Sequence, residues 1–311
     1  MVRERDTGSD IALERPQPPG AEESWHECWS FDFAQRDGLG GFVRLVTFPN
    51  AGRAWCWVYV ISPEHGLVVV RDHHVALPRR AGSLEIRAEA LWAELVCETP
   101  MEHWGIGVEA FGVVLEDPLD GYRGEIGTRV AVGLDLEWVL DARPATERDA
   151  YEQPGHVHGD VLIGTDRLAF DGFGLRTHAW GDHRWWEHDG HRVNVGLDDL
   201  ALSVRIEGGP GARGARAWQW HPSGHGEAVA VRSRVAMGDD GFPTEEHLQV
   251  GETLALVLDV RGVAAVPLDP GGVPAAGLER ALCAVESADG RRGAGWAEWW
   301  HPGDPGRDRS V

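Results

Sequence analysis

The sequence predicts an all-β protein made of two consecutive antiparallel β-barrels that pack together. Apolar and polar residues alternate with a period of two in about a dozen segments, and this alternation is typical of half-buried strands. Gly, Pro, Asp and Asn separate the segments, and the 41 glycines suit a chain with many turns. The length of 311 residues exceeds that of one average domain. Closed barrels are the usual way in which such chains remove exposed strand edges.

The clearest strand is predicted at residues 53–62, "RAWCWVYVIS". Trp55, Trp57 and Tyr59 fall on one face of this strand, and the residues between them fall on the other. Weak helical spacing is confined to residues 274–286, "PAAGLERALCAVE". Strands therefore dominate the prediction along the whole chain.

A domain boundary is predicted at residues 141–155, because this segment is charged, contains proline and shows no periodicity. It separates one barrel at residues 21–142 from a second barrel at residues 143–302. The charged, proline-rich residues 1–20 and the similar residues 303–311 are expected to be disordered tails.

Composition narrows the classes of partner. The 29 basic and 50 acidic residues give a formal net charge of −21, which argues against nucleic acid and against anionic membrane surfaces. No run of about 18 apolar residues occurs, and the N-terminus shows no apolar leader, so we expect a cytoplasmic protein without membrane insertion. The fifteen tryptophans suit either a β-sheet core or an aromatic pocket for a hydrophobic small molecule. The sequence leaves the oligomeric state open.

The main candidate site is the segment 172–186, "GFGLRTHAWGDHRWW". Read as one strand, it carries a polar and aromatic face, formed by Arg176, His178, Trp180, Asp182, Arg184 and Trp186. A face that combines an acid, a base and indole rings is typical of a walled pocket, although a structural ion-pair ladder would also explain it. We therefore name His178 and Asp182 as catalytic candidates. The substrate-binding candidates here are Arg176, Trp180, Trp185 and Trp186.

Two further segments supply candidate substrate-binding residues. In "YEQPGHVHGDVLIG", residues 151–164, His156 and His158 share a strand face, and with His178 they offer an alternative divalent-metal site. A hydrated strand face without metal is favoured over that alternative, because the spacing matches no specific metal signature. Trp104 could contribute to a pocket, although a structural role is the favoured interpretation.

Several motifs are missing from the sequence. It has no GxGxxG motif opening a helix, no GxSxG elbow and no lysine at all. Nucleotide cofactors, Schiff-base chemistry and serine-hydrolase chemistry are therefore poorly supported, and no cofactor or metal is expected.

The segment 171–186, "DGFGLRTHAWGDHRWW", resembles the signature of the AttH-like and carotenoid 1,2-hydratase-like superfamily. Residues 151–164 look like the lead-in strand of that family, and residues 23–69 are similar to the front half of a bacterial branch of it. The resemblance implies two lipocalin-like β-barrels packed together. It also implies relatives that hydrate isoprenoid double bonds or guide the cyclisation of polyenes, with no metal or redox cofactor.

The His-x-Trp pair of the hydratases maps onto His178 and Trp180. Their downstream Tyr-x-Asp pair corresponds to Arg205 and Glu207, which makes Glu207 a third catalytic candidate and replaces the tyrosine with an arginine. Thr177 stands where many relatives carry an aspartate. These departures put hydration of a carotenoid in doubt and leave the scaffold intact.

The function expected from this reasoning is cofactor-independent acid–base or cyclisation chemistry. The enzyme would be a lyase of the hydratase or dehydratase type, or an isomerase of the cyclase type. Its substrate would be an isoprenoid, a steroid or a polyketide-like molecule in a tryptophan-lined pocket. The alternatives are a lipocalin-like carrier of a hydrophobic small molecule and, less favoured, a metal enzyme that uses His156, His158 and His178.

Overall fold

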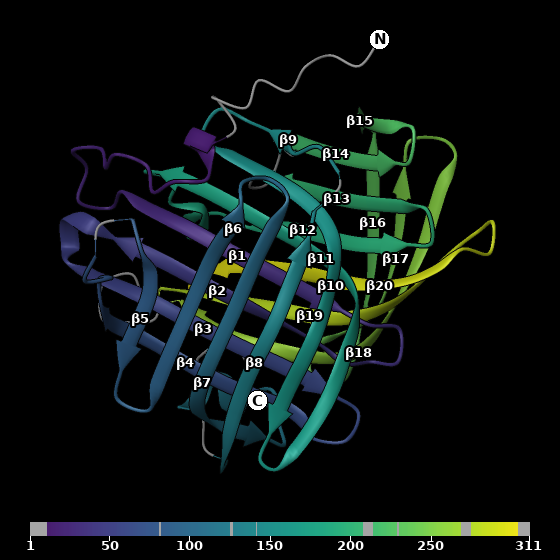
Figure 1. Cartoon of the computed structure of the whole chain (residues 1–311). Helices are drawn as coiled ribbons and strands as arrows, with labels where there is room; N and C mark the ends of the chain where they lie inside the picture. Colours follow the sequence, from purple (N-terminus) through teal and green to yellow (C-terminus); the bar gives the residue numbers. More distant parts are fainter. Residues whose placement is uncertain are drawn as a thin grey trace.

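The computed structural model describes residues 11–80, 82–124, 127–140, 142–207, 214–228, 230–268 and 275–303. Almost all regular structure in these ranges is antiparallel strand (Figure 1), so the predicted all-β class is confirmed. The short helical segments are residues 11–13, η1 (Pro49–Ala51), α2 (Asp120–Arg123) and η2 (Trp185–Glu187). No helix in the described ranges has the length and apolar character needed to cross a bilayer.

The first sheet has eleven strands along the path β4-β3-β2-β1-β11-β10-β8-β7-β6-β5, with β9 paired to β10. Because β4 also pairs with β7, this sheet closes on itself into a ring. Its strands are β1 (His26–Ala34), β2 (Gly40–Phe48), β3 (Arg53–Ser62), β4 (Gly66–Ala76), β5 (Leu84–Ala88), β6 (Leu91–Thr99), β7 (His103–Leu115), β8 (Thr128–Val139), β9 (Ala145–Thr146), β10 (Ala150–Ile163) and β11 (Asp166–Gly181).

The second sheet has nine strands in the order β15-β14-β13-β12-β20-β19-β18-β17-β16. Its strands are β12 (Gly190–Leu197), β13 (Leu200–Glu207), β14 (Gly214–His221), β15 (Gly224–Ala228), β16 (Val231–Met237), β17 (Pro243–Val250), β18 (Leu254–Leu268), β19 (Ala276–Ser287) and β20 (Arg292–Pro302). The end strands β15 and β16 do not pair with each other in the described residues, so this sheet is an open half-barrel rather than a closed one.

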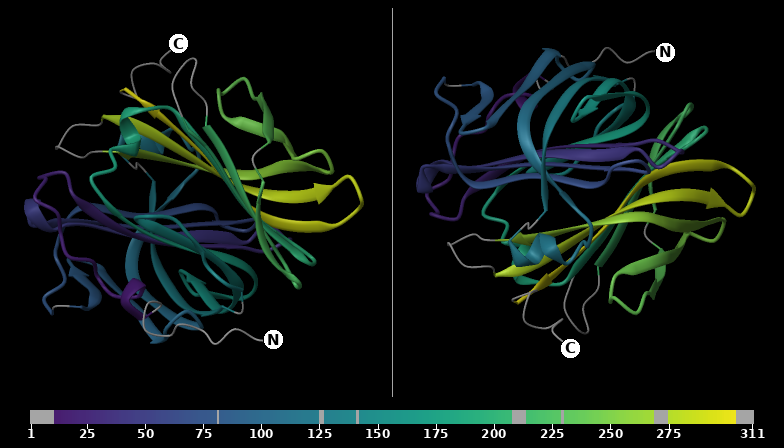
Figure 2. Two further views of the ribbon diagram at one scale, coloured as in Figure 1. Left: turned by 90° about the horizontal axis from the view of Figure 1, so that it is seen from above. Right: turned by 90° about the horizontal axis from the view of Figure 1, so that it is seen from below.

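The two sheets lie face to face, as Figure 2 shows. The predicted alternation of side chains along β3 is confirmed, and its two faces pack into two different hydrophobic cores. Trp55, Trp57 and Tyr59 belong to the apolar layer between the sheets, whereas Cys56 and Val58 belong to the core inside the first ring. One strand can do this because successive side chains point to opposite faces.

The change from one sheet to the other does not fall at residues 141–155. β10 pairs with β8 on one side and with β11 on the other, and β11 pairs with β1, so residues 150–181 belong to the first sheet and not to the second. The second sheet begins at β12. Within the charged segment, residues 142–149 contain the short strand β9 and lead into β10, and residues 150–155 already belong to β10, so a composition like that of a linker between domains lies inside a single sheet.

The strand predicted through Trp186 ends earlier. β11 stops at Gly181, whose φ of 126° is a conformation that favours glycine, and the chain then turns into η2. Asp182 and Trp186 therefore do not continue the face that carries His178. Residues 276–286, which show weak helical spacing, lie in strand β19.

A half-buried histidine beside the tryptophans between the sheets predicts an acid-sensitive fold. His73 of β4 packs against Trp55 and Trp57, with ring centroids 5.0 and 5.7 Å away, and burial lowers the pKa of His73 to about 3. The unfolded chain takes up this proton near pH 6.5, whereas the folded chain excludes it until about pH 3. Stability is therefore present above pH 6.5 and falls with decreasing pH, by about 1.4 kcal/mol per pH unit for this residue.

We expect the variant His73→Phe to remove this contribution, so that its free energy of unfolding falls less steeply between pH 7 and pH 5 than that of the wild type. Urea titrations at several pH values measure the slope. His74→Phe, the same change at the exposed neighbour, should keep the wild-type slope. An unchanged slope in His73→Phe would contradict the assignment.

Candidate functional site

A cavity of about 980 Å³ lies between the two sheets. The first sheet contributes Cys28, Ser30 and Arg44 to its wall, and the second contributes Arg192, Glu298 and Trp300. The connection between β11 and β12 covers one end of it. Its volume falls within the usual range for small-molecule sites, and its wall mixes apolar rings with a few polar groups.

Five of the ten residues predicted from the sequence line this cavity, namely Trp180, Asp182, Trp185, Trp186 and Glu207. Trp185 meets both Trp186 and Trp300 edge to face, with ring centroids 5.6 and 5.7 Å apart. Asp182 accepts a hydrogen bond from Ser24. The connection after Gly181 therefore supplies an aromatic wall and a carboxylate.

His178 lies on the opposite face of β11, inside the first ring, and does not line the cavity. Its side chain is fully buried and stacks on Trp29, with ring centroids 3.4 Å apart. Its Nδ1 donates to the carbonyl of Leu13 at 2.9 Å, and its Nε2 lies 2.8 Å from a carboxylate oxygen of Glu27. Both ring nitrogens of His178 therefore have protein partners.

Arg176 and Trp104 lie in the same core and not on the cavity. Arg176 makes two hydrogen bonds to Glu14, at 2.6 and 2.8 Å, and also bonds Gln153. Its guanidinium carbon lies 5.3 Å from the ring centroid of Trp104, which is 1% exposed. The motif arginine thus fixes the segment around Glu14 to the end of the ring.

His156 and His158 are exposed on the outer face of β10, and His156 lies 3.5 Å from Asp171. His178 points into the ring, so the three histidines lie on different faces of the first sheet and do not converge. The alternative interpretation of these three histidines as a metal site is therefore wrong. Among the described residues, one other group has metal-ligand composition, in which His103 lies 3.1 Å from Glu98 and 2.7 Å from Glu137.

A histidine not predicted from the sequence does line the cavity. His26 of β1 is 4% exposed and packs against Trp186, with ring centroids 5.3 Å apart. Its Nδ1–H donates to the carbonyl of Ser24 at 3.1 Å, which places the lone pair of the neutral ring on Nε2. No hydrogen bond to this Nε2 comes from the described residues.

The environment keeps His26 neutral. Burial lowers its pKa below the ordinary 6.5, nearby His183 lowers it further, and Asp182 partly opposes this shift. The sequence does contain a signal for this residue. In "HECWSFDFA" the polar residues alternate with Trp29, Phe31 and Phe33, which indicates a strand with one polar, buried face.

The inner end of the cavity is built from buried ion pairs that join the sheets. Glu298 forms ion pairs with Arg44 at 2.9 Å and with Arg280 at 2.7 Å. Arg280 also forms an ion pair with Asp32 at 2.6 Å. Burial alone would raise the pKa of Glu298, but Arg44 and Arg280 lower it to about 2. This carboxylate is therefore ionised at neutral pH and is unsuited to donating a proton.

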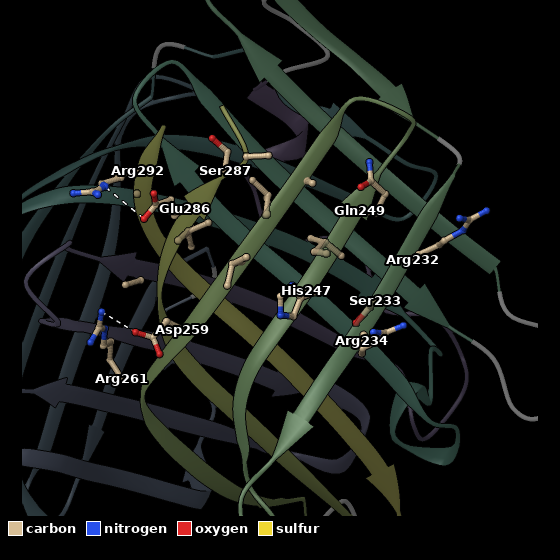
Figure 3. A pocket seen from close by; sticks show the side chains of 18 of the residues that line it. Arg232, Ser233, Arg234, His247, Gln249, Asp259, Arg261, Glu286, Ser287 and Arg292 are labelled. Atoms are coloured by element: carbon tan, nitrogen blue, oxygen red, sulfur yellow. Dashed lines mark ion pairs between the residues drawn. The ribbon is translucent and has the colours of Figure 1, made fainter. Parts of the chain in front are cut away.

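A second hollow, of about 1250 Å³, lies over strands β16 to β19 (Figure 3). Arg261 pairs with Asp259 at 2.9 Å and Arg292 pairs with Glu286 at 3.6 Å. Its lining contains no Trp, Tyr or Phe among the described residues. The cavity between the sheets is therefore the stronger candidate for a reaction on an apolar molecule.

The fold is that of a lipocalin-like protein with two packed antiparallel sheets and a cavity between them. The chain belongs to the family described as Domain of unknown function (DUF7064), whose model matches residues 10–303. No curated protein matches the sequence.

Several solved structures share the fold. A protein assigned as AttH from Nitrosomonas europaea superposes with a TM-score of 0.65 at 12% identity, over 90% of this chain and 94% of that one. Kievitone hydratase from Nectria haematococca gives 0.60 at 10% identity, over 93% and 92% of the two chains. CghA gives 0.59 at 12% identity, over 93% and 94%. The predicted AttH-like fold is confirmed, and kievitone hydratase is a hydratase built on it.

Proposed function

We propose that this protein catalyses cofactor-independent acid–base or cyclisation chemistry on a hydrophobic small molecule held between its two sheets. The reaction would be of the hydratase, dehydratase or cyclase type, and the substrate an isoprenoid, a steroid or a polyketide-like molecule. One observation carries the proposal: His26 has a neutral ring nitrogen that receives no hydrogen bond from the described residues, and it lines a cavity walled by tryptophans.

The residues of the cavity match what such a reaction requires. Adding water to an alkene, removing it, or cyclising a polyene passes through a state with positive charge on carbon. The faces of Trp185 and Trp186 would stabilise that charge, by about 0.5–2 kcal/mol each. His26 would accept a proton from water or from the substrate, and the carboxylate of Asp182 would stabilise the imidazolium that forms.

A cavity-filling variant tests where the chemistry occurs. Ala179 of β11 lines the cavity, and Ala179→Phe adds a ring to it. We expect this variant to lose turnover of a panel of apolar alkenes, alcohols and polyenes. Mass spectrometry would detect a product that has gained or lost one water or is an isomer of equal mass. The matched control Ala131→Phe, on the exposed face of β8, should retain wild-type turnover.

The outcomes separate an enzyme from a carrier. Compounds that bind the wild type, are excluded by Ala179→Phe and are returned unchanged would indicate a carrier. Turnover that survives in Ala179→Phe would place the reaction elsewhere in the molecule.

A further inference from the structure

The outer face of the first sheet carries three metal-ligating side chains that lie close together. Glu98 of β6, His103 of β7 and Glu137 of β8 come from three neighbouring strands (Figure 1). Trp104 and Trp138 belong to the core inside the ring, so His103 and Glu137, which precede them in the chain, point outward. One ligand atom from each residue of the group lies within 4.8 Å of the other two. None of the three lines the cavity between the sheets, so the proposed reaction does not account for them.

The strands bring the two carboxylates together over a glycine. Register pairs Gly105 of β7 with Glu137 of β8, and on the other side of β7 an irregularity at Glu98 interrupts the pairing with β6. Such bulges re-aim side chains. A Cβ atom built on Gly105 would lie 3.6 Å from both carboxylate oxygens of Glu137 and 3.7 Å from one oxygen of Glu98. Because glycine has no side chain, the space between these oxygens stays open.

The group has two carboxylates for one imidazole. Among the described residues, Glu98 and Glu137 form ion pairs with His103 alone, and no arginine reaches either of them. The carboxylate of Asp160, on the same outer face, is paired with Arg167 instead. Glu98 and Glu137 are 48% and 33% exposed, so an ion from solution can reach them. The formal net charge of −21 further favours a cation.

The ring of His103 is placed as in a metal-bound histidine. Its Nδ1 lies 3.1 Å from Glu98, and its Nε2 lies 2.7 Å from Oε2 of Glu137. That Oε2 is buried and still accepts no hydrogen bond from the described residues. Two ligand atoms that each bind one Zn²⁺ at about 2.0–2.2 Å lie roughly 3 Å apart, so the approach suits two ligands of one ion. The second ring nitrogen is then left to donate its N–H to a carboxylate, which is how metal-bound histidines are commonly oriented.

We propose that Glu98, His103 and Glu137 bind one divalent transition-metal ion of the Zn²⁺ class. The imidazole nitrogen favours zinc over Mg²⁺ and Ca²⁺, which prefer oxygen ligands. Three protein ligands leave the fourth tetrahedral position to water. The ion joins β6, β7 and β8 and so stabilises the closed ring, and it takes no part in the reaction proposed for the cavity.

Isothermal titration of untagged, chelator-treated protein with ZnCl₂ tests the inference. We expect one Zn²⁺ per chain, and an equal concentration of Mg²⁺ should not displace it. His103→Gln removes the nitrogen ligand and should weaken zinc binding by at least on the order of tenfold. Glu137→Gln and Glu98→Gln should each weaken it as well. All three side chains are at least 33% exposed, so these variants are expected to fold, which circular dichroism checks.

His156→Gln is the matched control. His156 lies on the outer face of the neighbouring strand β10, is 53% exposed and faces a single carboxylate, that of Asp171, at 3.5 Å. This variant should keep the wild-type affinity for zinc. Zinc should raise the Tm of the wild type and of His156→Gln, but not that of His103→Gln.

Four outcomes would overturn the inference. They are the absence of one-to-one zinc binding, an unchanged affinity in both His103→Gln and Glu137→Gln, an equal loss of affinity in His156→Gln, and displacement of zinc by an equal concentration of Mg²⁺. Zinc binding that is weakened by the ligand variants and kept in His156→Gln would support it, whether or not the cavity turns over any compound.

Discussion

His26→Gln is expected to lower kcat on a turned-over substrate by about 10²–10⁴-fold while the protein stays folded, because it removes the proposed base of the reaction. Glutamine can still donate to the carbonyl of Ser24, but its side chain cannot accept a proton at neutral pH. Steady-state kinetics measure the change, and circular dichroism checks the fold.

The pH dependence of the wild-type rate is a second, independent test of the role proposed for His26. The base acts when Nε2 is unprotonated, and burial lowers the pKa of His26 below 6.5. The wild-type rate should therefore be level near neutral pH and should fall only as the pH drops below 6.5, through the pKa of the folded protein. A rate without pH dependence would favour a cyclisation in which the cavity only holds the substrate in a reactive shape.

Two histidine variants serve as controls. His183→Gln changes a side chain that lines the cavity but is 59% exposed, and it should keep most of the activity. His178→Gln should lower stability rather than kcat. A stable His178→Gln protein without activity, together with an active His26→Gln protein, would assign the base to His178 instead.

Arg176→Met is expected to lower the free energy of unfolding by about 3–5 kcal/mol, because it leaves the buried carboxylate of Glu14 without its cation. Burial alone would raise the pKa of Glu14, but Arg176 lowers it below 4.5, so the pair is ionised at neutral pH. The Glu14 side chain is 2% exposed, so water cannot replace the lost arginine. Urea unfolding at pH 7 measures the change.

The exposed pair Arg167–Asp160 provides the matched control. Arg167→Met should cost less than about 1 kcal/mol, because water solvates both partners. The double variant Glu14→Leu with Arg176→Met should recover part of the stability, since it removes both buried charges. If Arg176→Met lowered the free energy of unfolding as little as Arg167→Met does, Arg176 would not be holding the segment around Glu14 against the first ring.

Much of the candidate site follows from the sequence, but the role of each residue does not. Alternation correctly separated the two faces of β3, and it placed Arg176 and His178 together on one face of β11. It could not show which face of β11 meets the second sheet, because both faces are buried by different cores. The motif histidine therefore looked catalytic, while the cavity histidine, His26, lay in a strand whose polar face gave the only clue.

The sequence by itself determined the all-β class, the strand alternation and the family resemblance, because these depend on local period and on a motif of contiguous residues. The tertiary structure decided that residues 150–181 complete the first ring, that the second sheet stays open, and that the cavity lies between the sheets. It also decided that Glu152 meets Arg192 and Arg205 across the interface. These features depend on pairing between segments far apart in the chain, and strand periodicity carries no information about which strands become neighbours.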